Sequence, residues 1–286
     1  MPEDFSATER AEHLNAAARD HLERWRLAPD GPVRRGPHAL VVPVRTADEI
    51  PAVLKVSLPE ADSEYEHLAL RRWGGDGAVR LLSADPPRRA LLLERLHLRD
   101  LSTLPDTEAC EVVAGLFAHL HAPALPRLRS LTAQVDRWQL DLQELPRSAP
   151  IPRRLVEQAV ASGRELAGAS SAPEVLLHGD LHYANVLAAD RASWLAISPD
   201  PVNGDPHYEL APMLWHRWDE LTGNIRDGVR HRFYTLVDAA ALDEDRARAW
   251  TVVRVVLAAV RALERADDAD RNALTRYVTI AKAVQD

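Results

Sequence analysis

The segment His178-Gly-Asp-Leu-His-Tyr-Ala-Asn185 carries residue types at a spacing that suits the transfer of a phosphoryl group. In such a segment one carboxylate, here Asp180, accepts a proton from an attacking hydroxyl or orients that hydroxyl. One carboxamide oxygen, here that of Asn185, helps to hold a magnesium ion on the phosphates of a nucleotide. His178 would orient the segment through hydrogen bonds. The segment therefore predicts Asp180 as the base, Asn185 as a metal ligand and His178 as a loop-orienting residue.

Apolar residues on both sides of this segment predict a strand before it and a strand after it. These runs occupy residues 175–177 and 186–187, and the resulting strand–loop–strand context is that of a kinase catalytic loop. The alternative is a polar turn between two short strands, whose aspartate and asparagine serve only turn geometry. We interpret His182 and Tyr183 as loop surface or as a wall of a substrate site.

Lys55 lies in a segment with strand-like alternation, in which its neighbours Leu54 and Val56 face the opposite side. A lysine that points inward from an otherwise apolar strand needs a partner, and the phosphates of ATP would supply one. Glu66, in the following predicted helix, is the natural ion-pair partner that aims this lysine, and Glu64 is the second choice. The alternative is that Lys55 is an exposed lysine on a strand.

The elements that must position these residues form two contrasting halves. Ser6-Ala-Thr-Glu9 is a capping box that opens a helix running to about Trp25. The first half continues with predicted strands at 38–46, 50–58, 78–85 and 89–96, and with a helix at 62–73. The second half is mainly helical, with predicted helices at 108–122, 131–145, 152–168, 207–223, 230–240, 243–265 and 272–284.

This order predicts an α+β, bilobal chain. Residues 1–96 would form a small sheet-bearing N-lobe that binds nucleotide, and residues 97–286 a larger helical C-lobe with the catalytic loop and the acceptor site. The last strand of the N-lobe would lead into an interlobe hinge, where the backbone of Glu94, Arg95 and Leu96 would pair with adenine. The alternative for these residues is an ordinary core strand. No segment matches the glycine-rich phosphate loop G-x-G-x-x-G.

Composition restricts the classes of function that remain. The chain has 286 residues, is 46% hydrophobic and 27% charged, and contains one cysteine, Cys110, which excludes an internal disulfide and a zinc site built from several cysteines. The formal charge of −8 argues against a nucleic-acid-binding protein and is compatible with a cationic small substrate. No apolar run is long enough to span a bilayer, and the acidic, polar N-terminus is not a secretory signal. We therefore expect a cytoplasmic protein, with a monomer favoured.

The chain resembles the streptomycin/aminoglycoside 6-phosphotransferases and their hydroxyurea phosphotransferase relatives over nearly its whole length. The resemblance rests on the order and spacing of PAVLKVSLP, GAVRLLSADPPRRALLLERL, LLHGDLHYANVL and WLAISPDPVNGDPHYELAPMLWHRWDEL. It implies a bilobal protein-kinase-like fold, the use of ATP and Mg²⁺, and phosphorylation of a hydroxyl on an antibiotic. Carried over by position, Lys55 binds phosphate, Asp180 is the base and Asn185 is a magnesium ligand.

The chain departs from this family at the strand that should bind the metal. The family strand typically ends Ile-Asp-Pro-Lys-Pro, whereas this chain reads Ile-Ser198-Pro-Asp200-Pro. A hydroxyl is a weaker magnesium ligand than a carboxylate. Asp200 would point to the same side as Ser198 in an extended segment but ~6–7 Å further along, so it would need a water bridge or a shifted loop to replace the missing aspartate. Glu209 also stands where the family usually has aspartate.

Three hypotheses follow from this departure. The first is an active phosphotransferase in which Asn185 and Asp200, or a water network, hold magnesium together with Ser198. The second is a catalytically impaired, kinase-like protein that binds nucleotide or a small ligand. The third is an engineered or accidental loss of the aspartate, which the second change at Asp200 makes less attractive. The retained Lys55, Asp180 and Asn185 favour an enzyme.

The acceptor site is predicted in the segment 213–221, which resembles a family segment after the metal strand. Trp215 and Trp218 would supply aromatic walls, and Asp219 and Glu220 anionic contacts to an amino or guanidinium group. At helical spacing the two tryptophans could equally be core residues. Weaker candidates of the same kind are Asp136 and Asp141.

Overall fold

The computed structural model describes residues 7–36, 38–59, 62–168, 174–221, 223–265 and 268–285, and the chain divides into two compact units. Unit 1 comprises Met1–Leu98 and Leu187–Asp200, and unit 2 comprises Arg99–Val186 and Pro201–Asp286. The lobes predicted from the sequence put residues 187–200 in the second lobe, whereas the structure puts them in unit 1. This segment folds with unit 1 because the backbone of Ala196 pairs with that of Gly77 and Val79, each at 2.9 Å.

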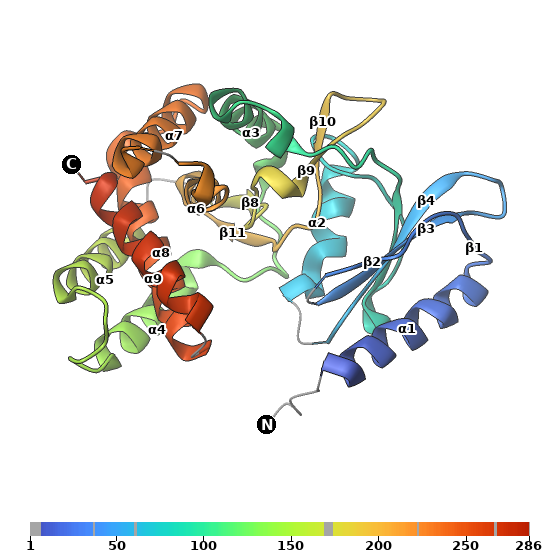
Figure 1. Ribbon diagram of the computed structural model, residues 1–286, viewed down its shortest axis with the longest axis horizontal. Helices are drawn as coiled ribbons and strands as arrows, with labels where there is room; N and C mark the ends of the chain where they lie inside the picture. The colour runs from blue at the N-terminus through green and yellow to red at the C-terminus, as the bar shows by residue number, and fades with distance from the viewer. Residues whose placement is uncertain are drawn as a thin grey trace. The chain divides into compact units, whose positions relative to one another are not determined.

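Unit 1 is built on an antiparallel sheet that has six strands among the described residues, in the order β1-β3-β4-β6-β5 with β2 beside β3 (Figure 1). Its main helix α1 (Ala7–Arg24) is followed by β1 (Ala28–Pro29), β2 (Arg34–Arg35), β3 (Ala39–Arg45) and β4 (Pro51–Ser57). Next come η1 (Asp62–Tyr65), α2 (Glu66–Trp73), β5 (Leu81–Asp85), η2 (Pro86–Arg88) and β6 (Ala90–Glu94). The hairpin β9 (Val186–Ala188) and β10 (Trp194–Ala196) completes the unit. These elements confirm the predicted strands and helices; Ser6 of the predicted capping box lies outside the described residues.

The two faces of β4 have different surroundings, which explains how a lysine fits between apolar residues on this strand. Ala52, Leu54 and Val56 are buried in a core with β3 and with the apolar face of α1. Because side chains alternate along a strand, Lys55 projects from the opposite face. The register pairs Lys55 with Leu91 of β6, so the lysine lies on an interior strand of the sheet.

Unit 2 is mainly helical. Its helices include α3 (Asp106–Leu120), α4 (Leu131–Glu144), α5 (Arg153–Gly168), α6 (Ala211–Trp215), α7 (Ile225–Ala239), α8 (Glu244–Arg265) and α9 (Asp268–Ala283). Short 3₁₀ turns are η3 (Leu101–Thr103), η4 (Tyr183–Asn185), η5 (Pro206–Leu210) and η6 (Trp218–Glu220). A small antiparallel sheet is formed by β7 (Ala122–Pro123), β8 (Val175–Leu177) and β11 (Val202–Gly204), in the order β11-β8-β7. The catalytic-loop segment follows β8 and ends in η4, so the predicted strand–loop–strand order is confirmed.

The predicted helix at 207–223 is wrong as a continuous element, because the chain breaks into η5, α6 and η6. His216 is extended and Arg217 adopts a left-handed conformation with φ 50°. The buried guanidinium of Arg232 on α7 donates to the carbonyl oxygens of Met213, His216 and Arg217. These bonds replace the helical partners that the carbonyls lose at the break.

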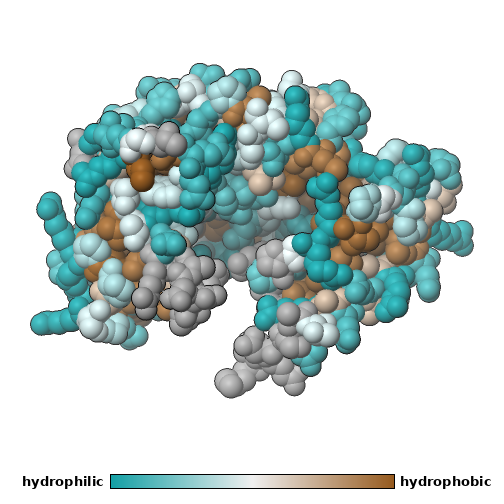
Figure 2. All heavy atoms as spheres, in the orientation of Figure 1, coloured by the Kyte–Doolittle hydropathy of each residue, from teal (hydrophilic) through white to brown (hydrophobic). Residues whose placement is uncertain are grey.

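Hydrophilic side chains cover most of the face shown in Figure 2, with smaller apolar areas between them. In the part of the chain that the structure describes, no helix is both long and apolar enough to cross a membrane.

Candidate active site

Unit 1 brings together three of the predicted residues: the buried Lys55, Glu66 and Ser198. The Nζ atom of Lys55 donates to both carboxylate oxygens of Glu66, each at 2.8 Å, and to the hydroxyl of Ser198 at 3.2 Å. The side chains of Lys55 and Glu66 are 11% and 1% exposed. Glu64, the second choice as a partner, is exposed and lies 3.8 Å from Arg89. The ion pair fixes the ammonium group at one place, as a phosphate-binding lysine requires.

Ser198 has an unusual backbone conformation at the position where the sequence resemblance implies an aspartate. Its φ is 53°, in the left-handed region that non-glycine residues rarely adopt and that aspartate and asparagine tolerate better than most. Such a conformation persists where the surrounding structure determines it. Ser198 therefore occupies a backbone position suited to aspartate. Asp200, two residues on, is partly buried in the same unit.

Unit 2 holds the catalytic-loop residues in a bonded turn. The amide nitrogen of Asn185 donates to the backbone oxygen of Asp180 at 2.8 Å and to its Oδ2 at 3.2 Å. These two bonds leave the amide oxygen of Asn185 for another partner. The Asp180 side chain is 44% exposed, so a substrate hydroxyl can reach it.

A buried network behind the loop fixes Gly179, which has a φ of 80° that favours glycine. The N–H of Gly179 donates to Oε1 of the fully buried Glu209 at 3.1 Å, and Arg254 on α8 donates to the carbonyl oxygen of Gly179. Burial raises the pKa of Glu209 to about 7, against the opposing charge of Arg254. The ring of His178 is buried and accepts the N–H of Asp180 at 3.3 Å, a contact of the kind that loop orientation needs.

Two further histidines lie beside the predicted base. Nε2 of His182 is 3.6 Å from Oδ2 of Asp180, and the ring of His182 stacks on that of His216. Burial alone would raise the pKa of Asp180, but the His182 contact and nearby positive charge hold that pKa below its usual value. Tyr183, expected at the surface or in a substrate wall, is instead 1% exposed and bonded to Asp106. His216 belongs to no motif in the sequence, so the sequence alone does not single it out.

The predicted hinge residues have side chains with structural partners in unit 1. The Glu94 carboxylate accepts the backbone N–H of Arg80 at 2.7 Å and three bonds from Nε and Nη2 of Arg191. Arg95 donates to the backbone oxygens of Ala52 and Val44 and to the Asp30 carboxylate. The backbone N–H of Glu94 also donates to the carbonyl oxygen of Arg80 at 3.0 Å, and Leu96 is partly buried.

The predicted acceptor residues all lie in unit 2 around the chain break. Trp215 and Trp218 are partly buried; Trp215 packs edge-on against Tyr277, and Arg276 lies 5.6 Å from the Trp218 ring. The Glu220 carboxylate is bound by Arg217, whereas the exposed Asp219 has no ion-pair partner among the residues described. The weaker candidates Asp136 and Asp141 are exposed on α4.

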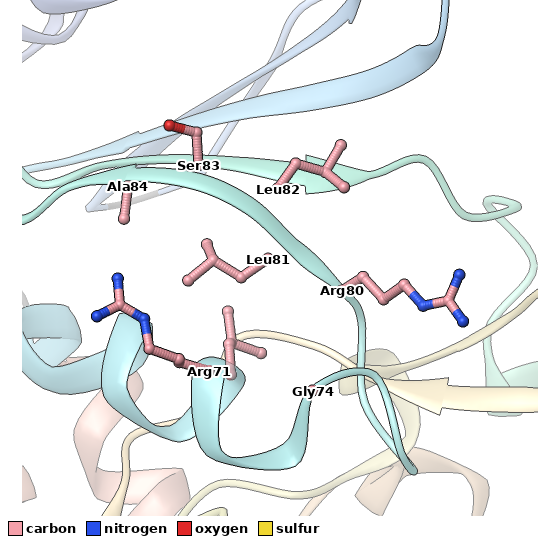
Figure 3. A pocket seen from close by; sticks show the side chains of 8 residues that line it. Arg71, Gly74, Arg80, Leu81, Leu82, Ser83 and Ala84 are labelled. Carbon is pink, nitrogen blue, oxygen red and sulfur yellow. The ribbon is translucent and has the colours of Figure 1, made fainter.

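A pocket of about 310 Å³ also lies in unit 1, between the end of α2 and strand β5 (Figure 3). Its lining residues are Leu70, Arg71, Gly74, Arg80, Leu81, Leu82, Ser83 and Ala84. None of the residues predicted to carry chemistry lines this pocket, so the pocket is distinct from the candidate site.

Comparison with known proteins agrees with this arrangement. The profile of the aminoglycoside/hydroxyurea antibiotic resistance kinase family matches residues 24–266. The chain is 38% identical to streptomycin 6-kinase of Streptomyces glaucescens, with 95% of this chain and 89% of the relative covered. It is 42% identical to hydroxyurea phosphotransferase of Kitasatospora aureofaciens, with 86% and 72% covered.

The fold is shared with solved kinases of low sequence identity. The crystal structure of aminoglycoside phosphotransferase APH(4)-Ia matches with a TM-score of 0.65 at 15% identity, and 94% of this chain and 99% of that chain are covered. The predicted α+β, protein-kinase-like fold is therefore confirmed. The comparisons support a kinase-type phosphotransferase and give no support to the catalytically impaired alternative. The chain belongs to the aminoglycoside/hydroxyurea antibiotic resistance kinase family.

Proposed function

We propose that this protein transfers the γ-phosphoryl group of ATP to a hydroxyl of a cationic aminoglycoside, of which streptomycin is the first candidate. The observation that carries the proposal is the accessible Asp180 carboxylate, held in a bonded loop with Asn185. The Lys55–Glu66 pair and relatives that act on streptomycin support it. Hydroxyurea is the second candidate acceptor, favoured by the hydroxyurea phosphotransferase relative.

The proposed residue roles follow the chemistry of phosphoryl transfer. Asp180 accepts the hydroxyl proton while the acceptor oxygen bonds to the γ-phosphorus and the bond to the departing ADP breaks. Lys55, aimed by Glu66, binds the phosphates of the nucleotide. His178 fixes the backbone of the catalytic loop. The carbonyl oxygen of Glu94 and the backbone of Arg95 and Leu96 bind the adenine.

The donor atoms proposed for magnesium suit a hard cation. Asn185 offers an amide oxygen, Ser198 a hydroxyl and Asp200 a carboxylate, and magnesium prefers oxygen ligands with water completing its shell. The amide nitrogen of Asn185 is already used toward Asp180, which orients its oxygen as the free group. When bound, the ion would neutralise charge on the nucleotide phosphates.

For the acceptor, we propose that Trp215 and Trp218 supply aromatic surface and that Asp219 contacts the cationic groups. Asp219 is preferred over Glu220 because Arg217 already neutralises Glu220. A guanidinium- or amino-bearing sugar would gain a charge-assisted hydrogen bond from the exposed carboxylate.

The test combines nucleotide binding with a transfer assay. ATP affinity is measured by calorimetry with and without magnesium, and products with streptomycin, other aminoglycosides and hydroxyurea are identified by mass spectrometry. We expect magnesium-dependent ATP binding and one phosphate added to an aminoglycoside. The D180N variant should lose turnover while keeping ATP affinity, and E144Q, which alters an exposed carboxylate at the end of α4 that has no predicted role in the site, should retain turnover. No ATP binding at millimolar magnesium would overturn the proposal.

A further inference from the structure

We propose that His182, held by ring stacking on His216, is a positioning residue that orients the Asp180 carboxylate toward the acceptor hydroxyl. The proposal rests on the proposed function. It assigns a role to two histidines to which the proposed function gives none.

The first observation is the direction of the His182 ring. Its Nε2 lies 3.6 Å from Oδ2 of Asp180, slightly beyond a hydrogen bond. Hydrogen bonds in catalytic sites are often long without substrate and shorten in the reactive complex. His182 is 8% exposed, so little water competes for this contact.

The second observation identifies which ring nitrogen carries the proton. The backbone N–H of Ala184 points at Nδ1 of His182 at 3.3 Å, so Nδ1 is the acceptor. In a neutral imidazole the other nitrogen is then the donor. Nε2–H of His182 therefore faces Asp180 as a donor.

These contacts distinguish the two oxygens of the Asp180 carboxylate. Oδ2 accepts a hydrogen bond from the amide of Asn185 at 3.2 Å and faces Nε2–H of His182 at 3.6 Å. Oδ1 has no donor among the residues that the structure describes. Two donors on Oδ2 hold the plane of the carboxylate, and Oδ1 is left to accept the proton of the acceptor hydroxyl.

His216 restrains the ring that supplies one of these donors. The two imidazole centroids are 3.6 Å apart, with an angle of 5° between the planes. Stacking of the two rings opposes rotation of the His182 ring about χ2. Without such a contact, the χ2 angle of a histidine has a broad distribution. His216 is itself fixed by the chain break, because Arg232 donates to its carbonyl oxygen at 2.6 Å.

A metal site made from the same three side chains is the competing explanation. Ligand atoms of Asp180, His182 and His216 lie within 4.8 Å of one another. However, parallel stacked rings direct their in-plane lone pairs along parallel planes, whereas a tetrahedral metal needs converging ligands. Nε2 of His182 also carries the proton that a metal would have to replace. The geometry therefore favours a hydrogen-bonding role.

The decisive experiment compares two amide substitutions at His182. In H182Q the terminal amide nitrogen reaches the place of Nε2 and keeps the donor toward Asp180. In H182N the amide lies at the place of Nδ1, so it keeps the contact with Ala184 and loses the one with Asp180. We expect H182Q to retain most of kcat. We expect H182N and H182A to lower kcat about tenfold to a hundredfold, a part of the ~10²–10⁴ attributable to general-base catalysis, with KM for both substrates unchanged. The reverse order, with H182N active and H182Q impaired, would show a role in loop structure only.

A matched pair at His216 tests the stacking. H216F keeps a flat ring without nitrogen atoms, and H216A removes the ring. We expect H216F to retain most of kcat and H216A to behave like H182N. If H216F is as impaired as H216A, stacking is not the operative contact and the proposal fails.

If the wild-type protein phosphorylates no acceptor, the proposed function is refuted. Two measurements would still test the orientation of the His182 ring toward Asp180 in that case. NMR of ¹⁵N-histidine-labelled protein should show His182 protonated at Nε2, with a signal that moves in D180A. An Nδ1-protonated His182, or a signal insensitive to D180A, would overturn the inference. Zinc titrations of the wild type and of H216F should show the same binding. Zinc binding that is present in the wild type and absent in H216F would establish the metal site instead.

Discussion

The side-chain nitrogen of Lys55 contacts the hydroxyl of Ser198 at 3.2 Å while it is bound by both oxygens of Glu66 at 2.8 Å. Ser198, at the position where the sequence resemblance implies an aspartate, therefore lies directly beside the lysine proposed to bind the nucleotide phosphates. The left-handed φ of 53° at Ser198 retains a backbone conformation suited to aspartate.

The substitution S198D should strengthen magnesium binding. It adds a carboxylate, which a hard cation prefers to a hydroxyl, at a backbone position that aspartate tolerates. We expect the magnesium concentration at half-maximal activity to fall about tenfold, because a charged ligand strengthens a hard-cation site. The neutral isostere S198N is the control, and an equal effect in both variants would contradict a role for charge.

Removing only the charge of Lys55 from the Lys55–Glu66 pair should lower the free energy of unfolding more than removing both charges. K55M leaves the 1%-exposed Glu66 carboxylate without its partner. We expect K55M to lower the free energy of unfolding by about 3 kcal/mol, and the double variant K55M/E66L to be less destabilised than K55M. Urea denaturation of the four proteins in the cycle measures this, and strictly additive losses would disprove the coupling.

The buried Glu209 should make stability depend on pH near neutrality. Its folded-state pKa of about 7 lies above the ordinary value of 4.5, so the folded protein holds this proton between those pH values and the unfolded chain does not. The contribution of Glu209 to stability is present below pH 4.5 and is lost as pH rises through about 7.

We expect E209Q, which cannot ionise and can still accept the Gly179 N–H, to abolish that component of the pH dependence. The difference in free energy of unfolding between E209Q and wild type should shift by roughly 2–3 kcal/mol in favour of E209Q between pH 5 and pH 8. Chemical denaturation across this range checks the sign. A constant difference would mean that Glu209 does not titrate there.

Arg95 should matter for stability and not for nucleotide affinity. Its guanidinium donates to the backbone oxygens of Ala52 and Val44 and to the Asp30 carboxylate. We expect R95M to lose about 1–3 kcal/mol of unfolding free energy, since buried acceptors lose their donor. The ATP dissociation constant should stay within about twofold, a change of less than 0.5 kcal/mol.

The control for R95M is R71M. Arg71 is exposed at the end of α2 and has no hydrogen-bond or ion-pair partner among the described residues. R71M should leave the stability of the protein unchanged. A large loss of ATP affinity in R95M but not in R71M would indicate that the Arg95 side chain contacts the nucleotide.

Local sequence patterns determined much of this protein. Alternation along 51–57 placed Lys55 opposite the apolar core, and helical spacing placed Glu66 in the next helix, so their pairing was predictable. The turn from His178 to Asn185 was predictable from local pattern as well, because the bonds among its own residues join positions at most five apart.

Only the tertiary structure decided the contacts between distant segments. The chain break at His216 depends on Arg232 of another helix. Its guanidinium donates hydrogen bonds to carbonyl oxygens that would otherwise be buried without a partner. The stacking of His182 on His216 joins residues that no local period relates. Segment 187–200 joined unit 1 through backbone pairing of Ala196 with residues more than a hundred positions earlier. Periodicity reports which face of an element is buried, whereas the partner on that face is selected by the packing of the whole chain.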